Sequence, residues 1–386
     1  MKKIAVITAT RAEYSLLRPV YLELKKIKNI KVDLIVTGTH LSKDNGRTIN
    51  EIKEDRIRIY KKIPIIKNRH ESISNIFSNA LLAFDKLFKK EKYNMIVLLG
   101  DRYETLAFAT DAMFNNIPIA HLYGGETTQG AIDEAIRHSI SKMSYLHFTS
   151  CDEYKNRVIQ LGENPRRVFN VGSVGIENVV KTKLLSKAEL SRKLKIDLDK
   201  YFVVTYHPVT LNSGDQNIKE FQNVLKALEK YDEYQVVFTK SNADEGGYVI
   251  NKMIDKFCAK HDNAHSFFSL GSTNYFSLVK YAKCVVGNSS SGLTEVPALL
   301  VPTVNIGDRQ SGRIMSNSIY SCKPICSDII KCIDKSMKLK KAYKLKDLLL
   351  YKKDTSKNIA RVIRKFLFNE NINLKKKFFD VKGWSK

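Results

Sequence analysis

The sequence lacks any apolar run long enough to cross a lipid bilayer, and it has far fewer acidic than basic residues. Of its 386 residues, 65 are Lys or Arg and 40 are Asp or Glu, which gives a formal charge of +25. A transmembrane helix needs about 20 consecutive apolar residues, so we expect no membrane span. The first apolar run, IAVITAT, ends at Arg11 and fits a buried strand better than an export signal. We expect a cytoplasmic, globular protein.

Two cofactor signatures are also missing. The first strand-like segment is followed by Thr8, Thr10 and Arg11 where a dinucleotide-binding loop would place the glycines of G-x-G-x-x-G. This disfavours a nicotinamide enzyme. The last three of the six cysteines lie close together but form no CxxC pair and have no neighbouring histidines, so we expect reduced thiols and no metal site. The cysteines are Cys151, Cys258, Cys284, Cys322, Cys326 and Cys332. We expect no cofactor.

The excess positive charge has two interpretations, a polyanionic partner or a bias in composition. Lysines are spread along the chain among Ile and Asn and become denser only after about residue 331. Proteins that bind single-stranded nucleic acid combine basic grooves with aromatic residues on which bases stack, and no such patch is present. We expect no nucleic-acid partner, whereas an anionic small-molecule substrate is consistent with the charge.

The first half of the chain alternates short apolar runs with helical spacing, which is typical of parallel sheets with helical crossovers. Hydrophobic residues make up 43% of the chain, enough for a buried core. We predict a doubly wound α/β domain over residues 1–175. The strand-like runs are residues 3–10, 32–38, 94–101, 118–124 and 145–150, with a helical pattern over 14–26.

The same rhythm restarts near residue 201 and predicts a second domain of the same class over residues 176–352. A charged stretch ending at Lys200 is interpreted as a weakly structured connection. Residues 353–368 have helical spacing, and we expect this helix to pack back on the first domain, with a loosely ordered basic tail up to residue 386. Two Rossmann-like domains with a cleft between them describe the GT-B architecture, although other paired folds of this class remain open.

Charged side chains of both signs gather between Gly100 and Lys142. GDRYE and HLYGGETTQGAIDEAIRH each follow an apolar run, and ligands of parallel sheets bind at the carboxyl ends of the strands. Acid/base catalysis needs such ionisable groups close together, while helix capping and surface charge would give the same residues. The acidic members are Asp101, Glu104, Glu126, Asp133 and Glu134, and the basic members are Arg102, His121, Arg137 and His138.

The second half carries an anion-binding pattern. In GNSSSGLTE, small and hydroxyl-bearing residues precede a helix, whose exposed N–H groups attract anions. Glu295 follows in the same helix, where it either favours the helix dipole or accepts ribose hydroxyls. His207 ends a strand before Pro208, and Arg309 follows another strand. A capped helix with no ligand and a purely structural histidine are the alternatives.

Nine motifs, taken in order, resemble those of the hydrolysing UDP-N-acetylglucosamine 2-epimerases, in particular the bacterial sialic-acid-pathway type. The resemblance covers residues 1 to about 320. The motifs are TATRAEYS, TGTHLS with NGRT, GDRYE, GGE with DEAIRHSISK, GSVG, YHPVTL, SNAD, GNSSSGLTEVP and NIGDRQSGR.

The resemblance implies a GT-B enzyme that converts UDP-N-acetylglucosamine and water to N-acetylmannosamine and UDP, for sialic acid synthesis. The path it implies is anti elimination to 2-acetamidoglucal followed by hydration. It also implies a homo-oligomer, a dimer or a tetramer. The acid/base positions of the family fall on Asp101, Glu126, Asp133 and Glu134, with His207 near the diphosphate or in a proton relay. The nucleotide-binding positions fall on Arg11, Arg102, Asn242, Ser289, Ser290, Glu295 and Arg309.

The chain departs from the family pattern at one position. Many members read HIEGGE where this chain reads HLYGGE, so Tyr123 replaces a carboxylate. A phenol has a pKa near 10 and cannot act as a carboxylate base at neutral pH. This shifts the acid/base assignment toward Glu126 and Asp133. It also keeps open a modified sugar, UDP- or GDP-linked N,N′-diacetylbacillosamine in legionaminic acid synthesis. A GT-B glycosyltransferase, which would share the anion-binding loop, is the remaining alternative.

Overall fold

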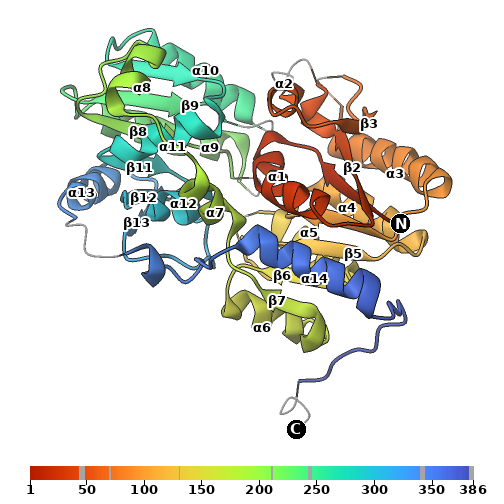
Figure 1. The fold of residues 1–386 in the computed structure, drawn as a ribbon. Coiled ribbons are helices and arrows are strands. Elements are labelled where there is room, and N and C mark those ends of the chain that lie inside the picture. Colours follow the sequence, from red (N-terminus) through yellow and green to blue (C-terminus); the bar gives the residue numbers. More distant parts are fainter. Residues whose placement is uncertain are drawn as a thin grey trace. The chain divides into compact units, whose positions relative to one another are not determined.

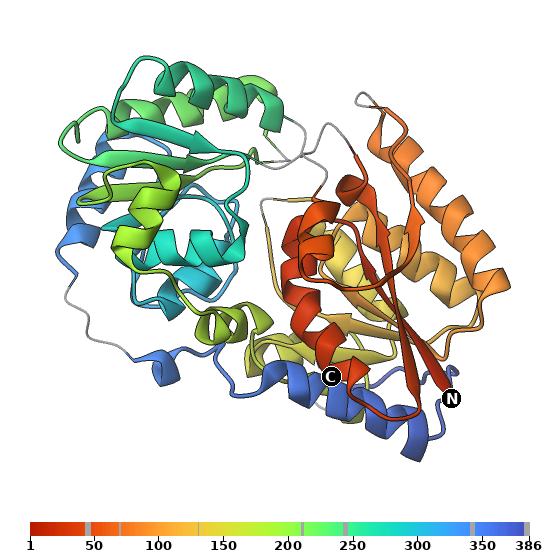
Figure 2. The same ribbon diagram turned by 45° about the horizontal axis from the view of Figure 1, so that its top comes forward.

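The chain folds into two compact units, each built on one parallel sheet (Figures 1 and 2). A computed structural model describes residues 1–42, 48–68, 71–129, 131–209, 212–241, 246–339 and 344–381. Unit 1 comprises residues 1–126, 133–177 and 350–386, and unit 2 comprises residues 127–132 and 178–349. Residues 127–132, which the sequence division counts with the first domain, thus group with unit 2.

The sheet of unit 1 is parallel throughout, with strand order β3-β2-β1-β4-β5-β6-β7. This confirms the predicted doubly wound fold. The sequence patterns indicate β1, β2, β4, β5 and β6 but miss both edge strands. The strands are β1 (Lys2–Thr8), β2 (Ile30–Thr37), β3 (Ile59–Ile63), β4 (Met95–Leu99), β5 (Ile119–Leu122), β6 (Leu146–Thr149) and β7 (Val168–Asn170).

Successive residues of β1 enter different cores, because side chains of a strand alternate between the faces of the sheet. Ile4 and Val6 pack in one core with α1 (Arg11–Lys25) and α14 (Thr355–Asn369). Ala5 and Ile7 pack in the other, against the helices that cover the opposite face. Those helices are α3 (Ile73–Lys90), α4 (Tyr103–Phe114) and α5 (Asp133–Met143). Unit 1 also contains η1 (Gly38–His40), α2 (Ile49–Glu54), α6 (Asp152–Gln160) and η2 (Pro165–Arg167).

The sheet of unit 2 repeats this plan, with strand order β10-β9-β8-β11-β12-β13 and parallel pairing throughout. Its strands are β8 (Tyr201–Thr205), β9 (Gln235–Thr239), β10 (Ala264–Phe267), β11 (Cys284–Gly287), β12 (Thr303–Ile306) and β13 (Ile319–Cys322). One core contains α9 (Gly214–Leu228), α10 (Gly247–Cys258) and α13 (Cys326–Met337), and the other contains α8 (Lys187–Leu194), α11 (Gly271–Tyr281) and α12 (Ser291–Ala298). A short η3 (Leu345–Asp347) follows α13.

The charged stretch before Lys200 follows α7 (Val174–Lys181) and contains α8, so the prediction of a weakly structured connection is wrong for residues 187–194. Ser186 and Glu189 form a capping box that starts α8. Leu190 is fully buried in the core of unit 2 and determines which face of α8 packs against that core. A short helix with one buried apolar position gives a weak periodic signal, which explains the error.

Both sheets change winding direction at one point, between β1 and β4 in unit 1 and between β8 and β11 in unit 2. Ligands of open parallel sheets bind beyond the carboxyl ends of the strands at such a switch point. The loops found there are TATRAE after β1 and GDRYE after β4, and in unit 2 YHPV after β8 and GNSSSG after β11. The motifs selected from sequence therefore occupy both switch points.

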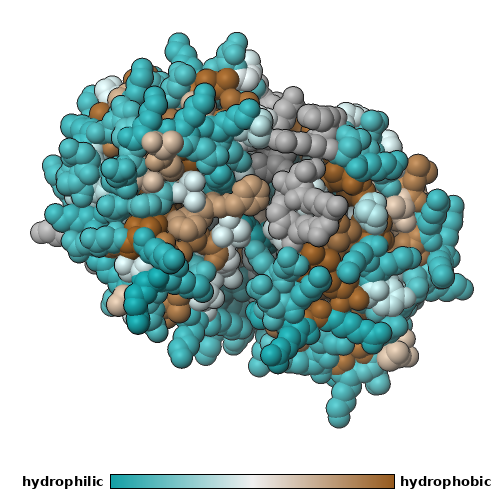
Figure 3. Space-filling view, turned by 90° about the horizontal axis from the view of Figure 1, so that it is seen from above, coloured by the Kyte–Doolittle hydropathy of each residue, from teal (hydrophilic) through white to brown (hydrophobic). Residues whose placement is uncertain are grey.

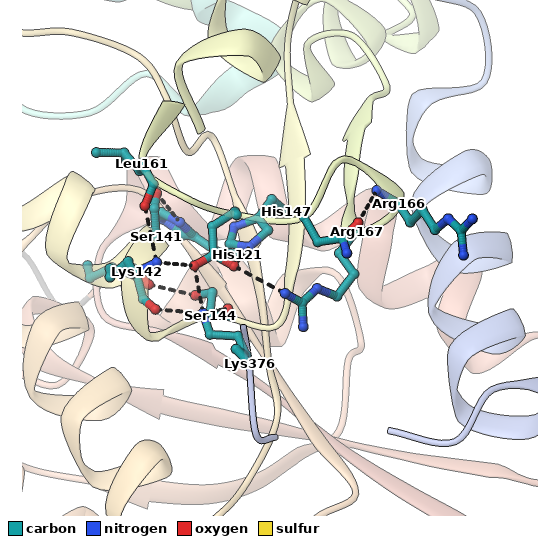
Figure 4. A network of polar contacts seen from close by, with 12 residues as sticks. His121, Ser141, Lys142, Ser144, His147, Leu161, Arg166, Arg167 and Lys376 are labelled. Atoms are coloured by element: carbon teal, nitrogen blue, oxygen red, sulfur yellow. Dashed lines mark hydrogen bonds and ion pairs between the residues drawn. The ribbon is translucent and has the colours of Figure 1, made fainter. Parts of the chain in front are cut away.

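The C-terminal segment returns to unit 1. Helix α14 packs against α1, as Figure 2 shows, and residues as far as Val381 continue beyond it. The ammonium group of Lys376 donates hydrogen bonds to the carbonyl oxygens of Lys142 and Ser144, both at 2.7 Å, and to Glu163 Oε1 at 2.8 Å (Figure 4). Contrary to the expectation of a loose tail, the segment after α14 is therefore attached to unit 1 at Lys376.

Glu163 is the buried centre of this contact, with a side chain only 1% exposed. Burial alone would raise the pKa of its carboxyl, but hydrogen bonds from His147 and Lys376 outweigh burial and hold that pKa at about 2. Burial lowers the pKa of His147, so the neutral ring donates its Nε2–H to Glu163 Oε2, 3.1 Å away. Lys142 is a further ion-pair partner, at 3.0 Å.

The outer surface contrasts with these cores. On the face shown in Figure 3, hydrophilic residues dominate and hydrophobic ones form small separate groups. Within the described ranges, no helix combines the length and the apolar character that a bilayer crossing requires. All six cysteines, each a described residue, are free thiols.

Replacing Lys376 with methionine should lower the free energy of unfolding by about 1–3 kcal/mol, because two backbone carbonyls and Glu163 lose a buried donor. A carboxyl with a lowered pKa stabilises the fold above its ordinary pKa and loses this contribution as the pH falls toward the folded value. Without Lys376 the loss should begin at a higher pH. Urea unfolding between pH 3 and 7 measures both effects.

The matched control is Lys377→Met, at the exposed neighbouring position. If both variants unfold at the same urea concentration as the unchanged chain, the tail contact contributes nothing and this interpretation is contradicted.

Candidate active site

Arg137 on α5 is the centre of the acidic cluster in unit 1. Its side chain is only 1% exposed and forms ion pairs with Asp101 and with Glu134, the latter at 3.2 Å. It also donates to the backbone carbonyl of Glu126 at 2.9 Å. Burial opposes the charge of Arg137, but the carboxylates of Asp101, Glu126 and Glu134 more than compensate and raise its pKa. One buried cation thus holds three of the predicted acid/base residues together.

The sequence analysis included Arg137 among the charged residues of this stretch but did not identify it as the centre of the cluster. It lies three residues after Glu134 and one turn along the same helix, where i and i+3 side chains meet. The contact with Asp101 spans 36 residues and depends on the sheet, which no local pattern reports.

The other predicted carboxylates lie in the loop after β5 and in the first turn of α5. Glu126 is only 6% exposed, and Ser150 donates its hydroxyl to Glu126 Oε1 at 3.1 Å. Glu134 also contacts His138 Nε2 at 3.1 Å. Asp133 is the first residue of α5 and is half-buried. The cluster therefore offers carboxylates in environments that differ in exposure and in partners.

His121 on β5 supports the loop that carries Asp101. Its ring is fully buried between the Gly100 carbonyl, 2.8 Å from Nε2, and the Ser141 hydroxyl, 3.2 Å from Nδ1 (Figure 4). Because a carbonyl only accepts, Nε2 carries the ring proton. Burial lowers the pKa of His121 to about 3, so the ring stays neutral. His121 fixes Gly100, directly before Asp101, and positions the loop.

The phenol group of Tyr123 anchors the loop after β5 to α7. Its backbone has φ +66°, a left-handed conformation that is uncommon outside glycine. The phenol oxygen accepts the N–H of Gly175 at 3.0 Å and pairs with Ser173 Oγ at 3.1 Å. Both partners lie at the start of α7, about fifty residues away in sequence. The hydroxyl ties the loop after β5 to this helix.

Gly125, two residues further on, permits a close approach. It has φ +79°, and a Cβ there would lie 2.1 Å from the carbonyl oxygen of Tyr154. No other residue fits this position without moving α6. The loop can therefore run directly over α6 and bring Glu126 to Ser150.

Two predicted arginines lie at the switch point of unit 1. Arg11 is the first residue of α1, after the N-cap Thr10. Arg102 precedes α4, and its Nε donates to Glu104 Oε1 at 2.8 Å. The sequence analysis counted Glu104 among the charged residues between Gly100 and Lys142 but gave it no role, and it did not include the buried Glu13 of α1.

In unit 2, Asn288 joins the two loops of the switch point. Its amide accepts the backbone N–H of His207 at 2.7 Å and donates to the His207 carbonyl at 2.8 Å. The carbonyl of Asn288 accepts from Arg309 Nη1 at 3.2 Å and from the Gln310 amide at 2.9 Å. His207 Nδ1 lies 3.2 Å from Ser241 Oγ. Sequence analysis selected His207 and Arg309 but not the asparagine that links them.

The serine loop leads into α12 as predicted. Ser290 is the residue before the helix, Ser289 Oγ lies 3.4 Å from the N–H of Ser291, and Glu295 is half-buried in the second turn. A Cβ at Gly292 would lie 2.8 Å from Thr303 Cγ2, so glycine lets the helix start against β12. Asn242 and residues 45–47 of the NGRT motif lie outside the described residues.

Comparisons with known proteins find similarity along most of the chain. A family model described as UDP-N-acetylglucosamine 2-epimerase matches residues 22–364. The GDP/UDP-N,N′-diacetylbacillosamine 2-epimerase (hydrolyzing) of Campylobacter jejuni is 45% identical over 322 residues, 82% of this chain and 83% of that protein. The polysialic acid biosynthesis protein P7 of Escherichia coli is 39% identical over 386 residues, 99% and 98% of the two chains.

Among solved structures, the UDP-GlcNAc 2-epimerase of Methanocaldococcus jannaschii, in complex with UDP-GlcNAc and UDP, has the same fold. The TM-score is 0.80 at 19% sequence identity, and the match covers 94% of this chain and 99% of the other. At this identity the likeness supports the fold alone.

Replacing Tyr123 with phenylalanine should lower the free energy of unfolding by about 1–3 kcal/mol, because the Gly175 N–H loses its acceptor. The catalytic rate should stay within about threefold of the unchanged enzyme, since the hydroxyl is held by α7 and transfers no proton. Urea unfolding and turnover of nucleotide sugar measure the two effects. Tyr320→Phe on β13 gives the baseline for losing a phenol hydroxyl. A loss of about a hundredfold or more in rate, with the fold intact, would instead assign proton transfer to Tyr123.

Proposed function

Because this chain belongs to the UDP-N-acetylglucosamine 2-epimerase family, we propose that it converts UDP-N-acetylglucosamine and water to N-acetylmannosamine and UDP, for sialic acid synthesis. The observation that carries the proposal is the cluster of Asp101, Glu126 and Glu134 around the buried Arg137. The Escherichia coli relative, named for polysialic acid biosynthesis and matched along nearly its full length, supports the pathway.

The reaction needs a base, an acid and a site for the leaving diphosphate. A base removes the proton from C2 of the sugar while the bond between C1 and the UDP oxygen breaks, which leaves a C1–C2 double bond. Water then adds its hydroxyl to C1, and an acid returns a proton to the opposite face of C2. Positioned carboxyl groups typically contribute about 10²- to 10⁴-fold to such transfers.

We assign the base role to Asp101. Its ion pair with Arg137 orients the carboxylate, and its side chain is 22% exposed, so a substrate can reach it. His121 holds the preceding residue in place. Glu126, Asp133 and Glu134 provide the group that returns the proton and the group that activates water.

We assign the binding of the nucleotide to arginines and to the loops of unit 2. Ser289 and Ser290 offer hydroxyls and N–H groups at the start of α12, and Arg309 brings a cation to the same loop. Charge-assisted bonds of this kind suit a diphosphate. Arg11, Arg102, Asn242 and Glu295 complete the proposed set, with His207 beside the diphosphate or in a proton relay.

A second substrate is favoured by one comparison. The Campylobacter jejuni relative, at 45% identity, is named for GDP- or UDP-linked N,N′-diacetylbacillosamine. The chemistry at C1 and C2 is the same for both sugars, so the carboxylate cluster serves either. A glycosyltransferase would need an acceptor and would leave the C2 proton untouched.

We further propose that the enzyme is a cytoplasmic homo-oligomer. Six free thiols suit a reducing compartment. Leu82 on α3 and Phe114 on α4 are 65% and 69% exposed, and exposed apolar side chains of this size are common at subunit contacts. Light scattering of the purified chain tests the assembly, and the mass of one chain in solution would contradict it.

Turnover in D₂O tests the proposed reaction. Incubating the enzyme separately with UDP-N-acetylglucosamine and with the UDP- and GDP-linked diacetylbacillosamines, followed by NMR, should give free nucleoside diphosphate and a 2-epimerised sugar with deuterium at C2. Asp101→Asn should lower the rate by about a hundredfold or more. Glu153→Gln, on the exposed face of α6, is the matched control. Release of a sugar that keeps its C2 proton, or no turnover of any of the three, would contradict the proposal.

A further inference from the structure

Two buried glutamates meet at the switch point of unit 1 beside Arg102. Glu13 lies in the first turn of α1 and Glu104 in the first turn of α4, and they are only 6% and 1% exposed. Carboxylates are rarely buried to this extent unless they are paired. The reaction described above uses neither of them.

Glu13 connects the two loops. Its Oε2 accepts the backbone N–H groups of Ala9 at 2.8 Å and Thr10 at 3.2 Å, which forms the capping box of α1. Its Oε1 lies 3.4 Å from the hydroxyl of Thr105 on α4. A neutral carboxyl, or a glutamine, still accepts N–H groups at this position. The loop therefore keeps its structure when Glu13 takes up a proton.

Glu104 fixes Arg102. Its Oε1 accepts the Nε–H of Arg102 at 2.8 Å, which holds the guanidinium by its inner nitrogen. Its Oε2 is buried and has no hydrogen-bond partner among the described residues. The planar fork of an arginine is oriented once one nitrogen is held, so Glu104 acts as a positioning residue.

Glu13 and Glu104 together carry more negative charge than Arg102 can neutralise when both are ionised. With both glutamates ionised, two negative charges surround one guanidinium, and the group carries a net charge of −1. With Glu13 protonated the net charge is zero. Burial, and next the charge of Glu104, raise the pKa of Glu13 to about 7, whereas Arg102 lowers it. Glu13 therefore changes charge within the neutral range.

Other charged groups around this point are accounted for. Asp101 is paired with Arg137 of α5. His40 of η1 is neutral, because burial lowers its pKa to about 4. Arg11 lies on the same helix as Glu13. Its positive charge does not change with pH, because arginine is not deprotonated in proteins.

We propose that Glu104 orients Arg102, that the two glutamates set the net charge around its guanidinium, and that uptake of one proton by Glu13 strengthens the binding of a nucleoside diphosphate at this loop. The inference rests on the proposed function, which gives Arg102 a phosphate to bind. An anion brought to Arg102 favours the protonated form of Glu13, and by linkage the protonated form binds the anion more tightly.

Proton uptake on binding UDP tests this on the unchanged enzyme. Calorimetric titration with UDP at pH 7.5, in buffers of different ionisation heat, measures the protons exchanged. UDP itself is almost fully ionised at this pH, since its last pKa is about 6, and so it can only release protons. We expect net uptake by the wild-type enzyme and a clear reduction in Glu13→Gln. No uptake, or the same uptake in both, overturns the inference.

Affinity provides the second measurement. The ratio of the UDP dissociation constant of the wild type to that of Glu13→Gln should rise about fivefold or more between pH 6.5 and 8.5, because only the wild type gains the negative charge. In Glu104→Gln the pH dependence of UDP binding should move to lower pH, because the negative charge of Glu104 no longer raises the pKa of Glu13. A merely structural role for Glu13 would give a ratio that does not change with pH, and this outcome overturns the inference.

The matched control is Glu189→Gln, which alters the corresponding position of the exposed capping box of α8. It should leave both proton uptake and affinity unchanged, and circular dichroism checks that each variant folds. If UDP binds, but the ratio of its dissociation constants for the wild type and Glu13→Gln does not change with pH, only this inference fails. Should UDP not bind to the wild-type enzyme at all, the proposed function fails with it.

Discussion

The buried guanidinium of Arg137 is the constraint on which the candidate site of unit 1 depends. Placing a charge at 1% exposure is unfavourable unless partners of opposite charge surround it. Here the partners are Asp101 in the loop after β4, the carbonyl of Glu126 in the loop after β5, and Glu134 on α5 itself. The need to pair one cation therefore brings the carboxylates together, and a change in any of these loops is felt by the others.

The sheet order explains why these loops meet. Strands β4 and β5 are neighbours, and His121 on β5 reaches the carbonyl of Gly100 after β4. In unit 2 a neutral side chain joins two loops. The amide of Asn288 forms hydrogen bonds with the backbone N–H and carbonyl of His207 across the β8/β11 switch point. In each unit a single buried polar side chain holds neighbouring loops in place. In unit 1 this side chain is the charged Arg137, which suits carboxylates, and in unit 2 it is the neutral Asn288, which suits a loop that binds an anion.

The sequence predicted the central strands and the loops that follow them, because buried parallel strands read as continuous apolar runs. It missed edge strands such as β3, where IYKKI is only partly buried, and the helix α8 within a charged stretch. Of the twelve site residues predicted from the sequence, eleven lie among the residues that the structure describes. The prediction did not include the residues that hold them in place. Arg137 as a centre, Asn288, and the anchor of Tyr123 at Gly175 all depend on contacts between distant segments, which a local pattern does not report. The tail contact of Lys376 with Glu163 spans 213 residues for the same reason.

The central claim is that Arg137 and Asp101 act as one unit, and a double-mutant cycle on the free energy of unfolding tests it most directly. The variants are Arg137→Met, Asp101→Asn and the two combined, compared by urea unfolding at pH 7. Residues in direct ionic contact couple by about 0.5–3 kcal/mol, and the burial of Arg137 places the expected value in the upper half of that range. Effects that add to within about 0.3 kcal/mol would contradict the claim that this pair organises the site.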